Sequence, residues 1–267
     1  MKNILALMHD DSGQEARYQV ALDVTRALEG HLTCLDLTYI PPMTSGIYES
    51  AYVMVDLLTQ ESTREEANRA RMKRRLEHED VSWNWVDVTG DAAQTLRQAA
   101  TLADLIIVNR RLEDPATIDM RRTASELVVQ SGKPVLAVPA SCQRLSLDAA
   151  MIAWDGSICA AAAMRAAVPL LQKTRHVVLV ELQDGSIAAP AEEAASYLSR
   201  HGIPTLVERS TCRHGEAGER LIEALGRGGF GYLVMGGFGH ARFIEALFGG
   251  VTRTMLNKSP VPVFLAH

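Results

Sequence analysis

A chain of 267 residues is longer than most single domains and suits two domains of about 130 residues each. Its 47% hydrophobic and 22% charged residues are typical of a soluble globular protein, and a formal net charge of -5 argues against nucleic acid or an anionic membrane as partner. No apolar run resembles a signal peptide or reaches the roughly 18 residues of a membrane span, so we expect a cytoplasmic protein.

The first half alternates short strands rich in Val, Ile and Leu with longer helical stretches. Ser12 and Glu15 have the spacing of a capping box at the start of the first helix. This alternation predicts a parallel sheet that is covered by helices on both faces. We predict strands at 3–8, 32–38, 81–87, 104–108 and 134–139, and helices at 14–29, 56–78, 92–103 and 119–131.

The second half repeats the first. The segments that begin at Asp104 and Gly231 share a strand, a turn, a helical stretch, a Ser-x-x-Pro pattern and a final strand rich in Val. The starts of the halves also match, with Asp10 and Asp155 in corresponding turns. We therefore predict an α/β fold of two tandem doubly wound domains, 1–143 and 144–267, each Rossmann-like or flavodoxin-like with five strands in the order 3-2-1-4-5.

Glycines gather after the fourth predicted strand of the second half, in "VMGGFGHARFIEALFGG". Gly236 and Gly239 allow backbone N–H groups to approach a ligand closely, because no Cβ stands in the way. Gly249 and Gly250 open a further helix, whose N-terminal N–H groups favour an anion. The two turns could cradle phosphates, or the glycines could serve only to make the turns.

Gly236-x-x-Gly239, nine residues and then Gly249 resemble the nucleotide-binding signature of the universal stress protein family. The flanking "YLVMGGFGH" and "VTRTML" are similar to the family, and the two-half organisation of the whole chain resembles its tandem-domain members. The signature ends in G-[ST], whereas this chain has Gly250 at the last position. The lost hydroxyl is worth on the order of 1 kcal/mol, and Thr252 is near enough in sequence to replace it.

The resemblance implies a stress-response protein that binds ATP or a related adenine nucleotide in its second domain, with Mg²⁺ as a candidate companion. Asp155 would contact the adenine or its ribose, and Leu182 would line the adenine pocket. His240 and Arg242 are further candidates for phosphate contact. The family's ribose and phosphate contacts fall on Gly236, Gly239, Gly249, Gly250, Val251 and Thr252.

The first half lacks the glycines of this signature. The corresponding positions hold Asn109, Leu112, Arg121 and Arg122, so we expect no ATP bound there in the family's manner. Asp10 is then most simply a turn or cap residue. The arginines at 110, 111, 121 and 122 could bind another anion, or pair with the acids at 113, 114 and 119 on a solvated surface.

The stretch from Tyr39 to Leu58 could line an apolar pocket, cover a partner surface, or form a helix packed into the core. The histidines are dispersed, and we predict no metal ligands and no catalytic set. The four cysteines, Cys34, Cys142, Cys159 and Cys212, are predicted to be reduced thiols.

Three functions stay open: a nucleotide-binding sensor or regulator, a dimeric scaffold that binds a protein partner without nucleotide, and a slow ATPase. Retention of the glycines in one half alone favours the first. In the family that the chain resembles, the final strand, here "VPVFLAH", can pair domains within a chain or between the chains of a homodimer.

Overall fold

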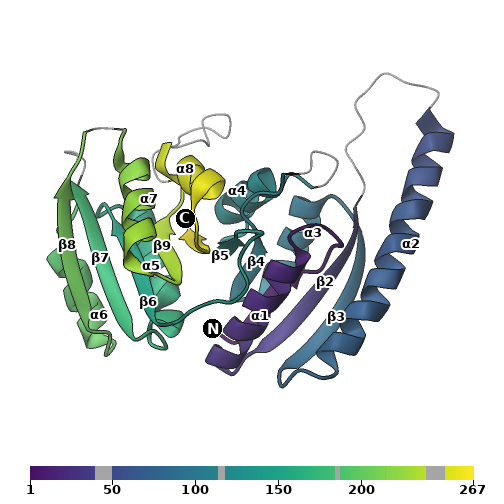
Figure 1. The fold of residues 1–267 in the computed structure, drawn as a ribbon, viewed down its shortest axis with the longest axis horizontal. Helices are drawn as coiled ribbons and strands as arrows, with labels where there is room; N and C mark the ends of the chain where they lie inside the picture. Colours follow the sequence, from purple (N-terminus) through teal and green to yellow (C-terminus); the bar gives the residue numbers. More distant parts are fainter. Residues whose placement is uncertain (40–49, 114–117, 184–186, 214, 239–249) are drawn as a thin grey trace.

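A computed structural model describes residues 1–39, 50–113, 118–183, 187–213, 215–238 and 250–267, without the side chains of 50–58. Its ten strands form one sheet in the order β3-β2-β1-β4-β5-β10-β9-β6-β7-β8 (Figure 1). The strands are β1 (Asn3–Leu7), β2 (His31–Tyr39), β3 (Ser82–Gly90), β4 (Leu105–Asn109), β5 (Val135–Val138), β6 (Ala149–Trp154), β7 (His176–Gln183), β8 (Thr205–Thr211), β9 (Tyr232–Gly236) and β10 (Val263–Ala266).

The helices alternate with these strands, as the sequence predicts. Those described are α1 (Gln14–Leu28), α2 (Ser50–Leu76), α3 (Ala92–Ala99) with the 3-10 turn η1 (Ala100–Leu102), α4 (Met120–Gln130), α5 (Ile158–Leu171), α6 (Ala191–Arg200), α7 (Ala217–Gly228) and α8 (Gly250–Lys258). The α/β class is confirmed. In each half the strands follow the predicted order 3-2-1-4-5, and neighbours within a half are parallel.

The two halves meet through their last strands, which run antiparallel. Leu136 of β5 pairs with Phe264 of β10, and these two residues hold equivalent positions in the repeat. Pairing between equivalents relates the halves by an approximate two-fold axis. The final strand therefore joins the two halves within one chain, one of the arrangements that the resemblance implies.

The core lies on both faces of this sheet because alternate residues of each strand point to opposite sides. Ile4 and Ala6 of β1 pack in the layer that contains α1, α2, α5 and α6. Leu5 and Leu7 pack in the layer that contains α3, α4, α7 and α8. Both strand faces are thus buried, which explains the nearly continuous apolar runs in the sequence.

Local hydrogen bonds support the repeat in one place and correct a prediction in another. Ser131 Oγ accepts from the N–H of Lys133 at 3.1 Å, and Ser259 Oγ accepts from the N–H of Val261 at 3.3 Å. The predicted capping box at Ser12 and Glu15 is wrong, because Gly13 is the N-cap of α1 and no side chain caps it. Glu15 instead pairs with Arg75 of α2 at 2.7 Å.

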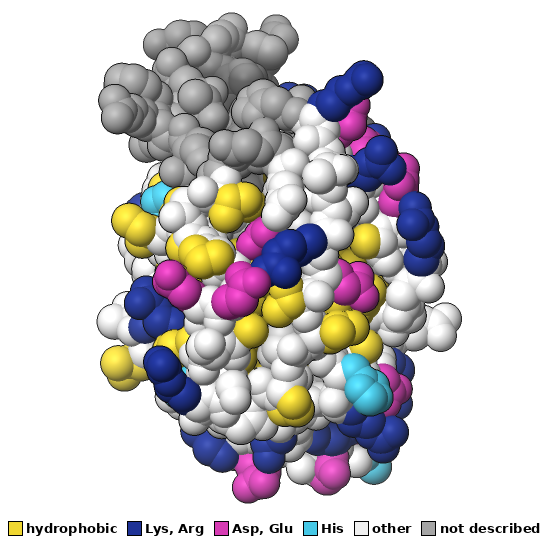
Figure 2. Space-filling view, turned by 90° about the vertical axis from the view of Figure 1, so that its left-hand side faces the viewer, with side chains coloured by type: hydrophobic (Ala, Val, Ile, Leu, Met, Phe, Trp, Pro, Cys, Tyr) yellow, Lys and Arg dark blue, Asp and Glu magenta, His cyan; other side chains and the backbone are white. Residues whose placement is uncertain are grey.

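Helix α2 begins at Ser50, earlier than the predicted residue 56. Of the stretch from Tyr39 to Leu58, residues 40–49 and the side chains up to 58 lie outside the described residues. At the opposite edge of the sheet, β8 is largely exposed, including Leu206 at 60%. Figure 2 shows this side of the molecule, where acidic, basic and hydrophobic side chains are interspersed. Among the described residues, no helix has the length and apolar character needed to cross a bilayer.

Candidate functional site

The turn between β6 and α5 presents Asp155 at the carboxyl end of the first strand of the second half. Asp155 Oδ1 accepts from the N–H of Ser157 at 2.9 Å, and Ser157 Oγ accepts from the N–H of Ala160 at 3.1 Å as the N-cap of α5. Asp155 is half-buried. From the described part of the chain, its second carboxylate oxygen receives no hydrogen bond.

The segment that leads into α6 lies against this turn. Gly156 has φ 73°, and a Cβ there would collide with the backbone of Ala189. The Trp154 indole N–H donates to the Ala189 carbonyl at 2.9 Å, and the N–H of Ala188 donates to the Asp155 carbonyl at 2.9 Å. These bonds hold the backbone of Asp155 in place and do not involve its carboxylate.

Gly236 ends β9, which pairs directly with β6. A Cβ on Gly236 would lie 2.5 Å from the backbone nitrogen of Ala160, so a side chain is excluded by the first turn of α5. Leu182 is the penultimate residue of β7, the other neighbour of β6, and it is half-buried. Asp155, Leu182 and Gly236 therefore lie at the carboxyl ends of three adjacent strands, at the point where strand order reverses and α/β proteins bind ligands.

The remaining predicted site residues lie at the start of α8 or outside the described chain. Gly250 is exposed, with nothing within 4 Å of the place where a Cβ would stand. Val251 is half-buried, and Thr252 is buried with its Oγ 3.5 Å from the N–H of Phe238. That contact connects α8 to the loop after β9. Outside the described residues lie Gly239, His240, Arg242 and Gly249.

The equivalent place in the first half is filled by side chains. Asn109 ends β4 as Gly236 ends β9, and it is fully buried. The Asn109 amide donates to the carbonyls of Gly13 at 3.3 Å and Val138 at 3.2 Å. A side chain on Gly13 would collide with that amide. The expected substitution of glycine by a larger residue thus fills the junction between β4 and α1.

Arg17 completes this filling, and sequence reasoning missed it. The buried guanidinium donates to the Leu7 carbonyl at 2.9 Å and the His9 carbonyl at 2.7 Å, and it pairs with Asp11 at 2.8 Å. It also bonds the Asn109 amide oxygen. Counted from the helix starts, the second half has Ala161 at this position.

Asp11, rather than Asp10, is the counterpart of Asp155. Asp11 Oδ1 accepts from the N–H of Gly13, two residues on, as Asp155 does from Ser157. Asp10 pairs with Arg71 of α2 at 2.8 Å. The first-half turn is longer, and for this reason alignment by sequence spacing pointed to the wrong aspartate.

The arginines of the first half divide between two roles. Arg111 pairs with Glu113 at 3.2 Å as expected, and Arg122 pairs with Glu126 at 2.7 Å. Arg110 departs from the expectation, because it donates to the Leu256 carbonyl at 3.0 Å at the end of α8. Burial, with the nearby charge of Arg111, lowers the pKa of Arg110.

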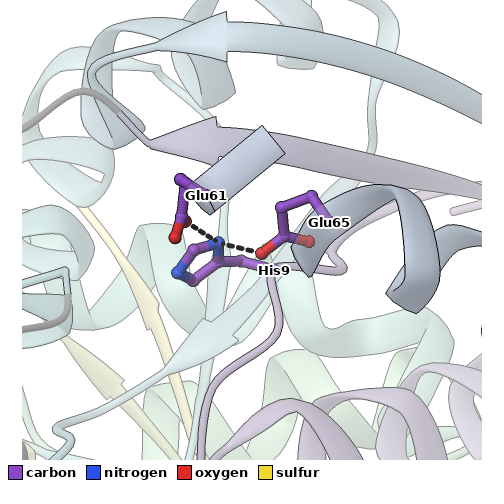
Figure 3. Close-up of side chains that lie close together, drawn as sticks. All are labelled: His9, Glu61 and Glu65. Carbon is purple, nitrogen blue, oxygen red and sulfur yellow. Dashed lines mark ion pairs between the residues drawn. The ribbon is translucent and has the colours of Figure 1, made fainter. Parts of the chain in front are cut away.

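A second group of polar residues, missed in the sequence, lies at the carboxyl ends of β1 and β2 beside α2. His9 Nδ1 is 2.8 Å from Glu65 and 3.6 Å from Glu61 (Figure 3). Burial is the largest single influence on His9 and lowers its pKa, but the hydrogen bond to Glu65 and the charges of Glu65, Asp11 and Glu61 together outweigh burial. The pKa of His9 therefore lies above its usual value. Burial, then the carboxylates of Glu65 and Asp87, raises the pKa of Asp36 to about 8.

A signal for this group does exist in the sequence. Glu61 and Glu65 are four residues apart on a helix and therefore share one face. Separately, Met8 and His9 come directly after the first strand. Only the packing of α2 against β2 shows that the two signals meet.

A family model described as the universal stress protein family matches residues 148–267. Over 99% of its length the chain is similar in structure to a universal stress protein from Archaeoglobus fulgidus DSM 4304, covering 95% of that chain at 16% identity with a TM-score of 0.74. A functionally unknown protein from Pseudomonas aeruginosa PAO1 matches 100% of the chain over 92% of its own, at 15% identity with a TM-score of 0.60.

No curated protein sequence matches the chain. Similarity to these two structures, at 15–16% identity, establishes the tandem fold. The match to the family model concerns the second half alone. Residues 148–267 thus match the universal stress protein family, and the first half of the chain repeats the same fold in tandem.

Proposed function

We propose that the second half binds one adenine nucleotide, ATP or a close relative, and that the chain acts as a sensor or regulator in a stress response. One contrast carries the proposal. Asp155 offers a carboxylate oxygen that no described residue engages, whereas its counterpart Asp11 is paired with the buried Arg17. A carboxylate at the switch point of a parallel sheet suits the hydroxyls of a ribose or the amino group of adenine.

Each predicted residue then has a task. Leu182 supplies apolar contact for the base, while Gly236, without a side chain, lets the end of β9 pack closely against α5. The backbone N–H groups of Gly250 and Val251, at the N-terminus of α8, favour the phosphates, with Mg²⁺ as their companion. Thr252 would support the loop that contains Phe238. Gly239 and Gly249 are proposed to complete the phosphate site.

The first half is proposed to bind no nucleotide in this manner. Arg17 and Asn109 are both buried and bonded to the carbonyls and the carboxylate that a ligand would need to approach. Displacing them would leave those groups unpaired, at a cost of about 1–3 kcal/mol for each buried group. We therefore expect one nucleotide per chain.

Calorimetric titration with Mg·ATP tests the proposal. The Asp155→Ala variant removes the carboxylate, and loss of a hydrogen bond to a charged group should weaken binding by about 10-fold or more. Asp148→Ala is the matched control, because Asp148 precedes the same strand at its opposite end and is exposed. Binding by wild type and control with loss in Asp155→Ala is expected; equal heats in all three would refute this site.

A scaffold without nucleotide is the alternative, and packing favours it in one respect. Gly236 is required by the approach of α5, and a Cβ on Gly237 would lie 2.9 Å from Val128 of α4. These two glycines therefore have reasons that involve no ligand. Absence of heat at millimolar Mg·ATP in the wild type would favour the scaffold.

A further inference from the structure

His9, Glu61 and Glu65 bring three metal-binding side chains to one point in the first half (Figure 3). Glu61 and Glu65 lie one turn apart on α2, and both face the His9 ring, which is 1% exposed. One ligand atom from each residue lies within 4.8 Å of the other two. The Leu37 carbonyl lies 3.0 Å from His9 Nδ1 and adds a fourth oxygen or nitrogen donor.

The spacing of these atoms matches a coordination sphere. Ligands about 2.1 Å from a metal are separated by about 3.0 Å along the edge of an octahedron and about 3.4 Å in a tetrahedron. His9 Nδ1 lies 2.8 Å from Glu65 and 3.6 Å from Glu61, close to that range. Little movement would be needed to bring all three atoms around one ion.

The two carboxylates are held in place by outer partners. Glu61 pairs with Arg64 through both carboxylate oxygens, Oε2 at 2.9 Å and Oε1, the atom nearest His9, at 3.0 Å. Glu65 Oε2 accepts from the Asn68 amide at 3.1 Å, while Glu65 Oε1 faces His9 and accepts from the N–H of Asp10 at 3.0 Å. Metal-binding carboxylates are commonly oriented by such second hydrogen bonds.

An independent observation also points to a cation. Asp36 is 4% exposed, and its Oδ1 has no hydrogen-bond partner among the residues that the structure describes. It lines, together with Glu65, a cavity of about 270 Å³ whose charged lining comprises four carboxylates and one guanidinium: Asp36, Glu65, Glu66, Asp87 and Arg69. A buried carboxylate oxygen without a donor is costly, and a cation in this region would compensate it.

We propose that His9, Glu61 and Glu65 bind a divalent transition-metal ion of the Zn²⁺ or Mn²⁺ class. Imidazole nitrogen suits Zn²⁺, and carboxylate and carbonyl oxygens suit Mn²⁺, so the mixed set disfavours Mg²⁺ and Ca²⁺, which prefer oxygen alone. The ion replaces the proton that His9 shares with Glu65. Asp36 lies beside Glu65 on the side of the cavity, where a bound cation would favour its ionised form. This site lies in the first half and does not depend on nucleotide in the second.

Titration of the full-length, chelator-treated protein with Zn²⁺, Mn²⁺, Mg²⁺ and Ca²⁺ in separate calorimetric runs tests this proposal. We expect one equivalent of Zn²⁺ or Mn²⁺ to bind, with at least tenfold weaker binding of Mg²⁺ and Ca²⁺. Binding should shift the imidazole signals of His9 in the NMR spectrum. Absence of binding at micromolar Zn²⁺ and Mn²⁺ would overturn the site, as would equal affinity for all four ions.

Two variants test whether the ion binds at this group of residues. Glu61→Gln removes one ligand charge from a partly exposed side chain, and should weaken binding at least tenfold. Glu77→Gln is the matched control, because Glu77 is exposed directly after the same helix and lies outside both the group of three and the cavity lining. Urea unfolding establishes that both variants are folded. Equal metal affinity of the two variants would overturn the assignment even if wild type binds an ion elsewhere.

Discussion

Asn109 and Gly236 occupy the same position in the two halves, as the last residue of the fourth strand of each. The Asn109 side chain bonds to the turn before α1, whereas the α carbon of Gly236 is pressed against the first turn of α5. In the first half, side chains thus fill the junction between the fourth strand and the first helix. In the second half, the backbones of the strand and the helix approach each other directly. This difference underlies the proposed division of roles between the halves.

Gly236→Ala should destabilise the protein by about 1–3 kcal/mol, the usual cost of overpacking. The new Cβ would lie 2.5 Å from the Ala160 nitrogen, and neither backbone can move easily. Gly226→Ala is the control, because nothing lies within 4 Å of its Cβ position inside α7. Helix propensity predicts that this control is more stable by up to ~1 kcal/mol. Urea unfolding measures both changes, and equal effects would contradict the packing argument.

Gly250→Ser should tighten nucleotide binding. The substitution restores the hydroxyl of the family signature at a position with open space around its Cβ. One added hydrogen bond of about 1 kcal/mol corresponds to a roughly fivefold gain in affinity. Gly250→Ala is the control that adds the carbon without the hydroxyl, and it should leave affinity unchanged. Equal affinity of the serine and alanine variants for Mg·ATP would show that position 250 faces no phosphate.

Arg17→Met should destabilise the first half by about 3–5 kcal/mol, because it leaves the Asp11 carboxylate buried without its partner. The double variant with Asp11→Asn should recover part of the loss, since both charges are then absent. Arg227→Met is the exposed comparison: Arg227 pairs with Glu223 on the surface, and its loss should change stability by about 0.5 kcal/mol at most. Chemical denaturation of the four proteins gives these values, and a small effect of Arg17→Met would contradict a buried ion pair.

The Cys34 thiol should resist modification in the folded protein. Burial, then the charge of Asp36, raises the pKa of Cys34 to about 12, and the side chain is 0% exposed. The folded pKa exceeds the unfolded value of about 8.5, so this group's contribution to stability falls as pH rises between these values. A thiol reagent followed by peptide mapping should modify Cys34 only after unfolding. Modification of Cys34 at the rate of the half-exposed Cys142 would contradict this.

Local patterns in the sequence predicted the central strands because each is a short apolar run that is buried on both faces, whereas the edge strands β3 and β8 are partly exposed. The repeat and the family resemblance supplied their order, and the match of Asn109 with Gly236 followed from the spacing of the two halves. The environment of Gly236 was predicted only in part: the sequence indicated a position without a Cβ, but helix α5, rather than a ligand, fills the space that a Cβ would need.

Arg17 could not be predicted in the same way. A charged residue near the start of an amphipathic helix normally faces solvent, and its burial here depends on carbonyls at the end of β1 and on Asn109, far away in sequence. The group around His9 is similar, because β1, β2 and α2 each contribute part of it. The error at Ser12 arose in the longer turn of the first half, where Gly13 took the capping position.

Hydrogen exchange with and without Mg·ATP, read by mass spectrometry of peptides, tests the division of roles between the halves most directly. We predict slower exchange in peptides that contain residues 154–160, 232–238 and 250–256, with no change at 8–17 and 105–111. Protection of the first-half peptides, or no change anywhere at saturating Mg·ATP, would contradict a nucleotide site that belongs to the second half alone.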